Sequence, residues 1–301
     1  MIAQSTKEYN AFGPWIFEIN EEYPIPPLFE KYYKEDETPL MLIKIPRKID
    51  RASAVPGMNL YDYVIGAFDE YLYILKRTGN SVEEKRVLYD SVVAIKNVIS
   101  LLKGQTLLYL WDETVTVEYN TVSEPIMMKL INIIREKYRK EEKVLDIEPI
   151  SHEINSIEHL YAAIIDQYKA LDQRIRLVAY QPPSRFLPIY KGFKQKMKAL
   201  LKIRKVITST AFITNDAELI VLQRDKRTRG SKQGDLTYST LFLPYASIEK
   251  ISMTEGTQDS KLDSMNIYIK DEVFTFLYSS TGLQINALGN ALKKLTNGTF
   301  Y

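Results

Sequence analysis

Hydrophobic and polar positions along the chain form two stretches of short β-like runs, and each stretch ends in a segment with helical spacing. The runs of the first stretch are rich in β-branched and aromatic residues, and they cover residues 40–45, 61–68, 71–75, 87–89, 92–102, 106–110 and 114–119. Apolar residues then recur every three or four positions from Met127 to Tyr138, after a helix start at Ser123 and Pro125. The pattern predicts a small β-domain closed by a helix.

The second stretch repeats this arrangement about 150 residues later. Its β-like runs cover residues 210–215, 218–223, 241–243, 248–253, 265–269 and 273–278. Ser280 can begin a last helix, whose apolar stripe is formed by Leu288, Ala291, Leu292 and Leu295. Residues 108–119 and 267–278 share tyrosine, Asp-Glu, threonine and tyrosine at the same spacing. Such an internal repeat predicts two copies of one unit.

Two further parts of the chain lie outside these stretches. Residues 1–37 are rich in aromatic residues and prolines, which predicts an extended arm packed on the first domain. Residues 140–204 form a connector with two amphipathic helices, at about 156–176 and 188–203, separated by prolines. The two domains then span residues 38–139 and 205–301.

Several of these sequence segments resemble a known protein family. Residues 210–222 look like the opening hairpin of bacterial pleckstrin-homology-like (PH-like) domains, and residues 242–251 look like their next strand and bend. Residues 64–75 and 89–99 are the looser counterparts in the first half. The resemblance implies two antiparallel β-barrels in tandem, each plugged by its C-terminal helix, in an α+β protein. It also implies a non-catalytic binding module, of a kind used elsewhere for phosphoinositides, proteins or self-assembly.

The loops of the opening hairpins depart from a lipid-binding pattern. Asp69 and Glu70 lie in the first loop, and Asp216 and Glu218 lie in the second. Acidic loops repel phosphoinositide headgroups, so no lipid-binding residue set is carried over from the family.

The composition limits the cellular compartments in which the protein is expected. With 301 residues and 45% hydrophobic content, the chain can bury two domain cores. It has no cysteine, which excludes disulfides, thiolate nucleophiles and cysteine-ligated metals. No basic-then-apolar leader opens the sequence, and no apolar run approaches the roughly 20 residues of a membrane helix. These features predict a cytoplasmic protein, with peripheral contact at the inner membrane face as the alternative.

The net charge of +2 hides a basic band in the middle of the chain. No aspartate or glutamate occurs between Gln173 and Asn215, a stretch that holds ten of the 40 lysines and arginines. Within it, the predicted helix at 188–203 and its end carry a basic stripe beside apolar residues, which gives the candidate binding set Lys191, Phe193, Lys194, Met197, Lys198, Lys202 and Lys205. Either this helix binds an anionic membrane or a partner, or its apolar face packs between the domains and its lysines are solvated.

A second basic cluster lies in a loop of the second domain. It supplies the secondary anion-binding candidates Lys226, Arg227, Arg229 and Lys232. The flanking Gly230 and Gly234 favour the simpler interpretation of a solvated surface loop.

No pattern of catalytic or metal-binding residues stands out. His152 and His159 are the only histidines, and seven helical residues separate them by about 10 Å along the axis, too far for one metal ion. No nucleophile-and-base arrangement or phosphate-cradling glycine loop can be singled out. We therefore predict a non-enzymatic protein with no cofactor, no metal and no identified small-molecule substrate.

The predicted function is binding or scaffolding. Protein partners or self-association are the expected contacts, with an anionic membrane surface as the alternative. Nucleic acid binding ranks low because the β-like stretches have no overall basic face. The scaffold interpretation requires an apolar patch or an open strand edge.

Overall fold

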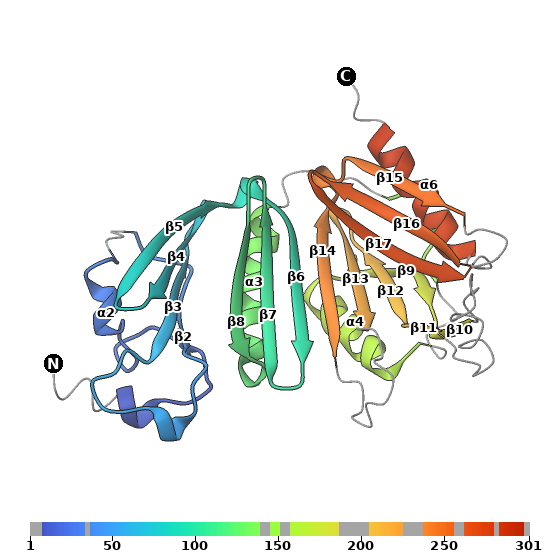
Figure 1. Cartoon of the computed structure of the whole chain (residues 1–301). Coiled ribbons are helices and arrows are strands. Elements are labelled where there is room, and N and C mark those ends of the chain that lie inside the picture. Colours follow the sequence, from blue (N-terminus) through green and yellow to red (C-terminus); the bar gives the residue numbers. More distant parts are fainter. Residues whose placement is uncertain are drawn as a thin grey trace, which may run out of the picture. The chain divides into compact units, whose positions relative to one another are not determined.

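The structure is a computed structural model in which the chain divides into two compact units (Figure 1). The first contains Met1–Ile95 and Ile99–Tyr138, and the second contains Lys96–Val98 and Arg139–Tyr301. The structure describes residues 8–33, 37–138, 145–150, 157–186, 205–224, 237–255, 262–279 and 283–297.

The first unit contains an antiparallel sheet in the order β1-β2-β3-β4-β5. Its strands are β1 (Phe17–Glu18), β2 (Met41–Pro46), β3 (Tyr61–Ala67), β4 (Tyr71–Thr78) and β5 (Ser81–Leu88). Apolar side chains stack across neighbouring strands, since Ile65 pairs with Ile43 on one side and with Ile74 on the other. Gly79 begins the turn between β4 and β5 with a φ of +65°, a conformation that other residues rarely adopt.

A second sheet and a helix complete this unit. The 3₁₀ turn η2 (Tyr89–Ser91) leads into β6 (Val92–Ser100), β7 (Lys103–Leu110) and β8 (Thr114–Asn120), which are neighbours in that order. Helix α3 (Glu124–Tyr138) follows η3 (Thr121–Ser123) and packs against η2 and β3. It buries Met127, Leu130, Ile131 and Ile134, so the predicted helix and its apolar face are confirmed.

The N-terminal segment packs in the core of this first unit. Phe12 and Phe29 are buried in the same cluster as Tyr61 and Leu75. Ser123 does more than precede α3, because its hydroxyl accepts the amide proton of Ile16 at 2.8 Å. The expectation of an extended arm needs correction, since residues 8–11 and α2 (Pro27–Glu30) are helical. Pro27 suits the first position of α2, where no amide donor is needed.

The second unit contains antiparallel strands and helix α4. The strands β9 (Arg176–Gln181), β12 (Thr210–Thr214), β13 (Glu218–Arg224) and β14 (Tyr238–Pro244) pair in this order. Before them lies α4 (His159–Leu171), which buries Tyr161, Ile164, Ile165 and Tyr168. The short strands β10 (Ser184–Phe186) and β11 (Lys205–Ile207) pair with each other.

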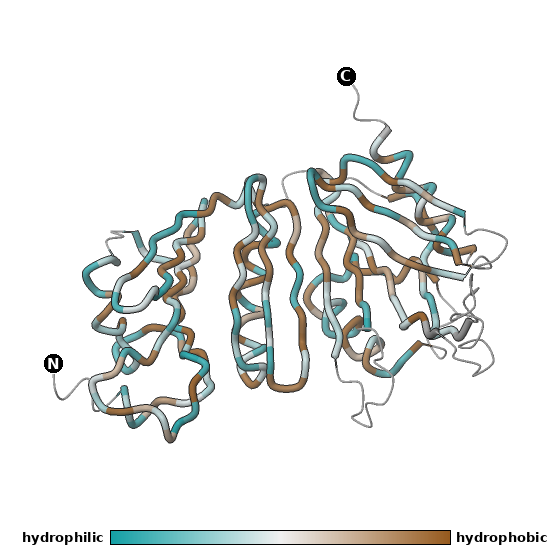
Figure 2. The backbone as a smooth tube through the Cα atoms, in the orientation of Figure 1, coloured by the Kyte–Doolittle hydropathy of each residue, from teal (hydrophilic) through white to brown (hydrophobic). Residues whose placement is uncertain are grey.

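A three-stranded meander and a terminal helix follow. The 3₁₀ turn η5 (Tyr245–Ser247) leads to β15 (Lys250–Thr254), β16 (Leu262–Ile269) and β17 (Glu272–Ser279), which pair in that order. Helix α6 (Leu283–Asn297) contacts β15 and β9 and buries Leu288, Ala291 and Leu292, as its stripe predicts. Figure 2 shows hydrophobic residues recurring along the strands and hydrophilic residues at the β7–β8 and β16–β17 turns.

The expectation of two closed barrels is wrong. The described residues form open antiparallel sheets with few helices, and strands such as β5 and β17 end their sheets without a further strand beside them. The physical reason lies in β5, whose solvent-facing positions carry Glu83, Glu84 and Arg86. Charges on an outer strand oppose the further pairing that closure requires.

The expectation of a purely helical connector also needs correction. Residues 140–204 contain α4, but β9 and β10 lie in the same stretch. The run Leu177, Val178 and Ala179 is buried because β9 pairs with β12. A short apolar run can be a strand or part of a buried helix, and only its pairing partner decides between them. No helix among the described residues has the length and apolar content needed to cross a membrane.

Candidate functional site

The candidate binding residues from the sequence fall mostly outside the described part of the chain. This holds for Lys191, Phe193, Lys194, Met197, Lys198 and Lys202, and for the loop residues Lys226, Arg227, Arg229 and Lys232. Lys205 begins β11, but its side chain is outside the described atoms. His152 lies in an undescribed stretch, and His159 is the first residue of α4. The described structure therefore brings none of these residues together in a site.

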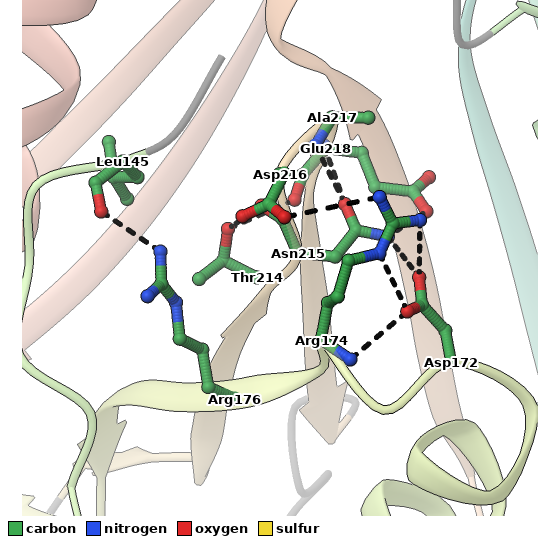
Figure 3. A network of polar contacts seen from close by, with 9 residues as sticks. All are labelled: Leu145, Asp172, Arg174, Arg176, Thr214, Asn215, Asp216, Ala217 and Glu218. Atoms are coloured by element: carbon green, nitrogen blue, oxygen red, sulfur yellow. Dashed lines mark hydrogen bonds and ion pairs between the residues drawn. The ribbon is translucent and has the colours of Figure 1, made fainter. Parts of the chain in front are cut away.

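A cluster of ionisable side chains surrounds the turn between β12 and β13 (Figure 3). Asn215 begins the turn, and its Oδ1 accepts the amide protons of Ala217 at 2.9 Å and Glu218 at 3.0 Å. Its Nδ2 donates to Asp172 at 3.1 Å and to the Glu218 carboxylate at 3.3 Å. Both the oxygen and the nitrogen of the Asn215 side-chain amide are therefore hydrogen-bonded, and the residue is completely buried. The side chain of Asn215, the first residue of the turn, therefore stabilises the turn.

Two arginines extend this cluster. The Arg174 guanidinium donates to both carboxylate oxygens of Asp172, with distances of 3.0 and 3.3 Å, and it lies 3.9 Å from Asp216. Arg176 reaches the other way and donates to the carbonyl of Leu145 at 3.0 Å. These contacts tie the end of α4 to the β12–β13 turn and the 145–150 segment to the start of β9.

The protonation of Asp172 fits a structural role. Partial burial by itself raises the pKa of this carboxyl, but hydrogen bonds from the Arg174 side chain and backbone and from Asn215 outweigh burial and lower it. Asp172 is thus held as a carboxylate. A carboxylate committed to these donors is poorly placed to accept a proton in catalysis. Among the described residues, no group of three or more metal-binding side chains could hold a metal ion.

Strand edges form a second class of candidate site, because an unpaired edge offers backbone donors and acceptors to a partner. Three of the outer strands, β9, β8 and β5, are protected. On β9, the amide of Ile150 donates to the carbonyl of Leu177 at 2.9 Å, and Gln284 of α6 accepts the amide proton of Tyr180 at 3.3 Å. On β8, the Tyr63 hydroxyl donates to the carbonyl of Thr116 at 3.3 Å.

Charge protects β5 as well. Lys85 forms an ion pair with Glu113, and the Arg86 guanidinium lies 4.3 Å from the centre of the Tyr71 ring. Edges of this kind discourage a second strand, because pairing would bring their charges against the partner.

The edge of β17 differs from these three along residues 272–278, although a side chain also accepts the amide proton of its last residue, Ser279. Among its residues only Glu272 is charged, while Val273 and Leu277 are 47% and 43% exposed. Phe276 and Tyr278, on the opposite face, are buried. In the β15-β16-β17 sheet, β17 is the end strand opposite β15 (Figure 1). An exposed apolar strand at the end of a sheet is a site where another strand can be added.

The pairing of β17 fixes which backbone groups face outward. The amide of Ser279 donates to Oε1 of Gln181 at 3.0 Å, so it points away from β16. Backbone groups alternate in direction along an antiparallel strand. Val273, Thr275 and Leu277 therefore also direct their N–H and C=O groups to the outer edge. We define the outward set of β17 as Val273, Thr275 and Leu277. It combines exposed side chains with outward backbone groups that have no partner strand among the described residues.

Sequence reasoning predicted the strand at 273–278 but did not identify it as a binding edge. A signal was present, because apolar residues occupy both faces of this strand: Val273 and Leu277 on one, Phe274 and Phe276 on the other. A strand with one solvated face normally alternates apolar and polar residues. The sequence matches no family model and no curated protein, so the function of this edge has to be inferred from its geometry.

Proposed function

We propose that this protein is a non-enzymatic assembly module that binds a second copy of itself through the outer edge of β17. The observation that carries the proposal is the outward set, which has no charged side chain, exposes the apolar Val273 and Leu277, and has no partner strand among the described residues. This is the open strand edge that a scaffolding function requires. The resemblance of the sequence to PH-like domains, which serve elsewhere in binding and self-assembly, also supports the proposal of self-assembly.

The outward set is self-complementary. If two copies of β17 pair antiparallel with Thr275 at the centre, Thr275 faces Thr275 and each Val273 faces Leu277 of the other copy. Apolar pairs and threonine pairs are favourable across neighbouring strands. The only charged residue of the strand, Glu272, faces Tyr278 and not another carboxylate in this register. A two-fold dimer needs such a self-complementary patch.

The size of the edge sets the expected strength. Three outward residues bury less surface than a permanent dimer usually needs, so we expect association that depends on protein concentration. We place the assembly in the cytoplasm, as predicted from the sequence. An anionic membrane contact through Lys194, Lys198 and Lys202 remains the alternative, tested by binding to anionic vesicles.

The test measures the oligomeric state by sedimentation velocity over a range of concentrations. Thr275→Pro removes the central outward N–H and the side-chain hydrogen bond to Asn266. It leaves the backbone hydrogen bonds to β16, because proline is tolerated where the amide faces away from the sheet. Leu277→Lys places a charge on the same edge. Leu171→Lys is the matched control, since Leu171 is 71% exposed at the end of α4 in the same unit.

We expect the wild-type protein and Leu171→Lys to dimerise with the same dissociation constant, and both β17 variants to weaken association by about tenfold or more. A wild-type protein that stays monomeric at every concentration would refute self-assembly. Dimerisation that persists in Thr275→Pro and Leu277→Lys would place the interface elsewhere.

A further inference from the structure

The turn between β6 and β7 exposes two leucines, one of them in a conformation that leucine rarely adopts. β6 ends at Ser100 and β7 begins at Lys103, so Leu101 and Leu102 form the turn. Leu101 has a φ of +53°, in the left-handed region that favours glycine and asparagine. The two side chains are 49% and 63% exposed. Neither the backbone conformation nor the contact with water favours leucine in this turn.

A second turn of the same length shows the residues that are usual in such a place. Lys270, with a φ of +51°, and Asp271 join β16 to β17, and both are exposed. Two-residue turns between antiparallel strands are commonly built from asparagine, aspartate and glycine. Figure 2 shows the β6–β7 turn as hydrophobic and the β16–β17 turn as hydrophilic. A strained turn that also exposes apolar side chains is typical of a functional surface.

The 3₁₀ turn η3 extends this apolar surface. Its Val122 is 47% exposed, and the preceding Thr121 is bonded to both leucines. The Thr121 hydroxyl donates to the carbonyl of Leu101 at 2.6 Å, and its amide donates to the carbonyl of Leu102 at 3.2 Å. We define the apolar tip as Leu101, Leu102 and Val122. The β6–β7 turn lies at the end of β7 opposite the β7–β8 turn (Figure 1).

A tryptophan lies beside the tip. Ile16, the residue after Trp15, donates its amide proton to the hydroxyl of Ser123, the residue after Val122. Trp15 is 51% exposed, and its ring occupies the space that a side chain at position 13 would need. Leucine and tryptophan together are typical of protein surfaces that contact lipid, with leucine in the hydrocarbon and indole near the headgroups.

The backbone of the tip suits an apolar medium. Both leucine carbonyls are bonded to Thr121, and the amide of Val122 donates to Oδ1 of Asn120 at 3.1 Å. Backbone groups that already have partners enter hydrocarbon at a lower cost than unpaired ones. The same carbonyls are not available for pairing with a strand of another protein. Three side chains are also far fewer than the about 20–30 residues that each partner contributes to a specific protein interface.

The charges near the tip favour an anionic lipid surface. Lys103 directly follows the two leucines, is exposed and forms no ion pair with a described residue. Of the carboxylates near the tip in sequence, Glu18 and Glu118 are each paired with a lysine, at 3.2 and 3.3 Å. Glu124 is only partly exposed and interacts with another group. The ammonium group of Lys103 can therefore reach lipid phosphates while the leucines lie deeper.

We propose that the apolar tip inserts into a lipid bilayer that contains anionic lipid. Leu101, Leu102 and Val122 enter the hydrocarbon, and Lys103 lies among the headgroups. The attachment is reversible, because three side chains bury little apolar surface. It uses the first unit alone and does not depend on assembly through β17.

The test measures co-sedimentation of the full-length protein with vesicles of phosphatidylcholine and phosphatidylglycerol, at low and at high salt. The double variant Leu101→Asn, Leu102→Gly replaces the leucines with a pair that suits a two-residue turn, so it removes the apolar side chains without adding strain. Leu88→Asn is the matched control, since Leu88 is 56% exposed at the end of β5 in the same unit.

We expect the wild type and Leu88→Asn to bind equally, and the double variant to bind about tenfold more weakly or worse, because two leucines no longer leave water. Part of the wild-type binding should persist at high salt, since salt screens charges but does not weaken apolar burial. The double variant should unfold at no lower denaturant concentration than the wild type, which separates loss of binding from loss of folding. Absence of vesicle binding, its complete loss at high salt, or equal binding by the double variant would overturn the inference.

The two tryptophans report which end of β7 meets the bilayer. Trp111 follows the last residue of β7, so the length of this strand, about 26 Å, separates it from the β6–β7 turn. Trp111→Phe leaves Trp15 as the only reporter, and Trp15→Phe leaves Trp111. With vesicles of brominated lipid, which quenches indoles that lie in the bilayer, Trp111→Phe should lose more fluorescence than Trp15→Phe. Equal quenching, or stronger quenching of Trp111, would place the contact elsewhere and overturn the inference.

Discussion

At the scale of single residues, Asn215 is the side chain whose removal should cost most among the groups at the β12–β13 turn. Replacing it with alanine deletes two acceptor and two donor contacts at a buried position. We expect Asn215→Ala to lower the free energy of unfolding by about 3 kcal/mol, because buried partners are left without hydrogen bonds. Chemical unfolding measures this change. The neighbouring Asp216→Ala is the control, with an expected change within about 0.5 kcal/mol; equal effects would contradict the assignment.

Asp172 predicts a dependence of stability on pH. Its pKa in the folded protein is lower than its ordinary value of 3.8, because donors from Arg174 and Asn215 outweigh burial. The carboxylate therefore stabilises the fold above the ordinary pKa, and this contribution is lost as the pH falls through the folded pKa. Unfolding measured at several pH values should show Asp172→Asn less stable than the wild type at pH 7 and the difference shrinking below about pH 4. A constant difference across this range would count against the charge as its source.

Some residue-scale features follow from sequence and others depend on the fold. The stripe of Met127, Leu130 and Ile134 predicted the buried face of α3, because helical spacing alone decides which residues share a face. The burial of Glu218 was not predicted, since an acidic loop looks solvated until its partner Asn215 is placed. The pair of Glu8 and Lys44 could not be found either, because 36 residues of chain separate them and no local pattern links them.

At the scale of elements, α6 offers a direct comparison of two leucines on one helix. Leu288 is buried in the face that packs toward β15 and β9, whereas Leu283, the first residue, is 80% exposed. We expect Leu288→Ala to cost about 2–5 kcal/mol in the free energy of unfolding, because it leaves a cavity. Leu283→Ala should change stability by less than about 0.5 kcal/mol. Both are measured by denaturant unfolding, and similar losses would show that α6 does not pack through this face.

The presence of a strand is easier to predict from sequence than the strand with which it pairs. Strands β3 and β12 were predicted because they are apolar and well bounded. Most of β5 was missed, since Glu83, Glu84 and Lys85 mask its β character, although Gly79 and Asn80 mark the hairpin turn before it. β9 was taken as connector because only its pairing with β12 distinguishes it. Whether a sheet closes or stays open also depends on strand pairing, so it cannot be predicted from a local sequence pattern.

At the scale of the whole molecule, the chain divides into two compact units, and we expect them to unfold in separable steps. Both tryptophans of the chain, Trp15 and Trp111, belong to the first unit. Tryptophan fluorescence therefore reports on that unit, while circular dichroism reports on both. We expect Leu72→Ala, at a fully buried position of β4, to shift the fluorescence transition to lower denaturant. Leu288→Ala in the second unit should shift the dichroism transition and leave the fluorescence transition in place.

Leu72→Ala and Leu288→Ala together distinguish independent unfolding of the two units from unfolding as one cooperative body. If each unit folds on its own core, the double variant should show both shifts with sizes that add, because substitutions without shared partners act independently. If Leu288→Ala moves the fluorescence transition by as much as Leu72→Ala does, the chain unfolds as one cooperative body. Self-association through β17 adds a further check, since it stabilises the second unit by mass action. Raising the protein concentration should then raise the dichroism midpoint alone, and Thr275→Pro should abolish that dependence.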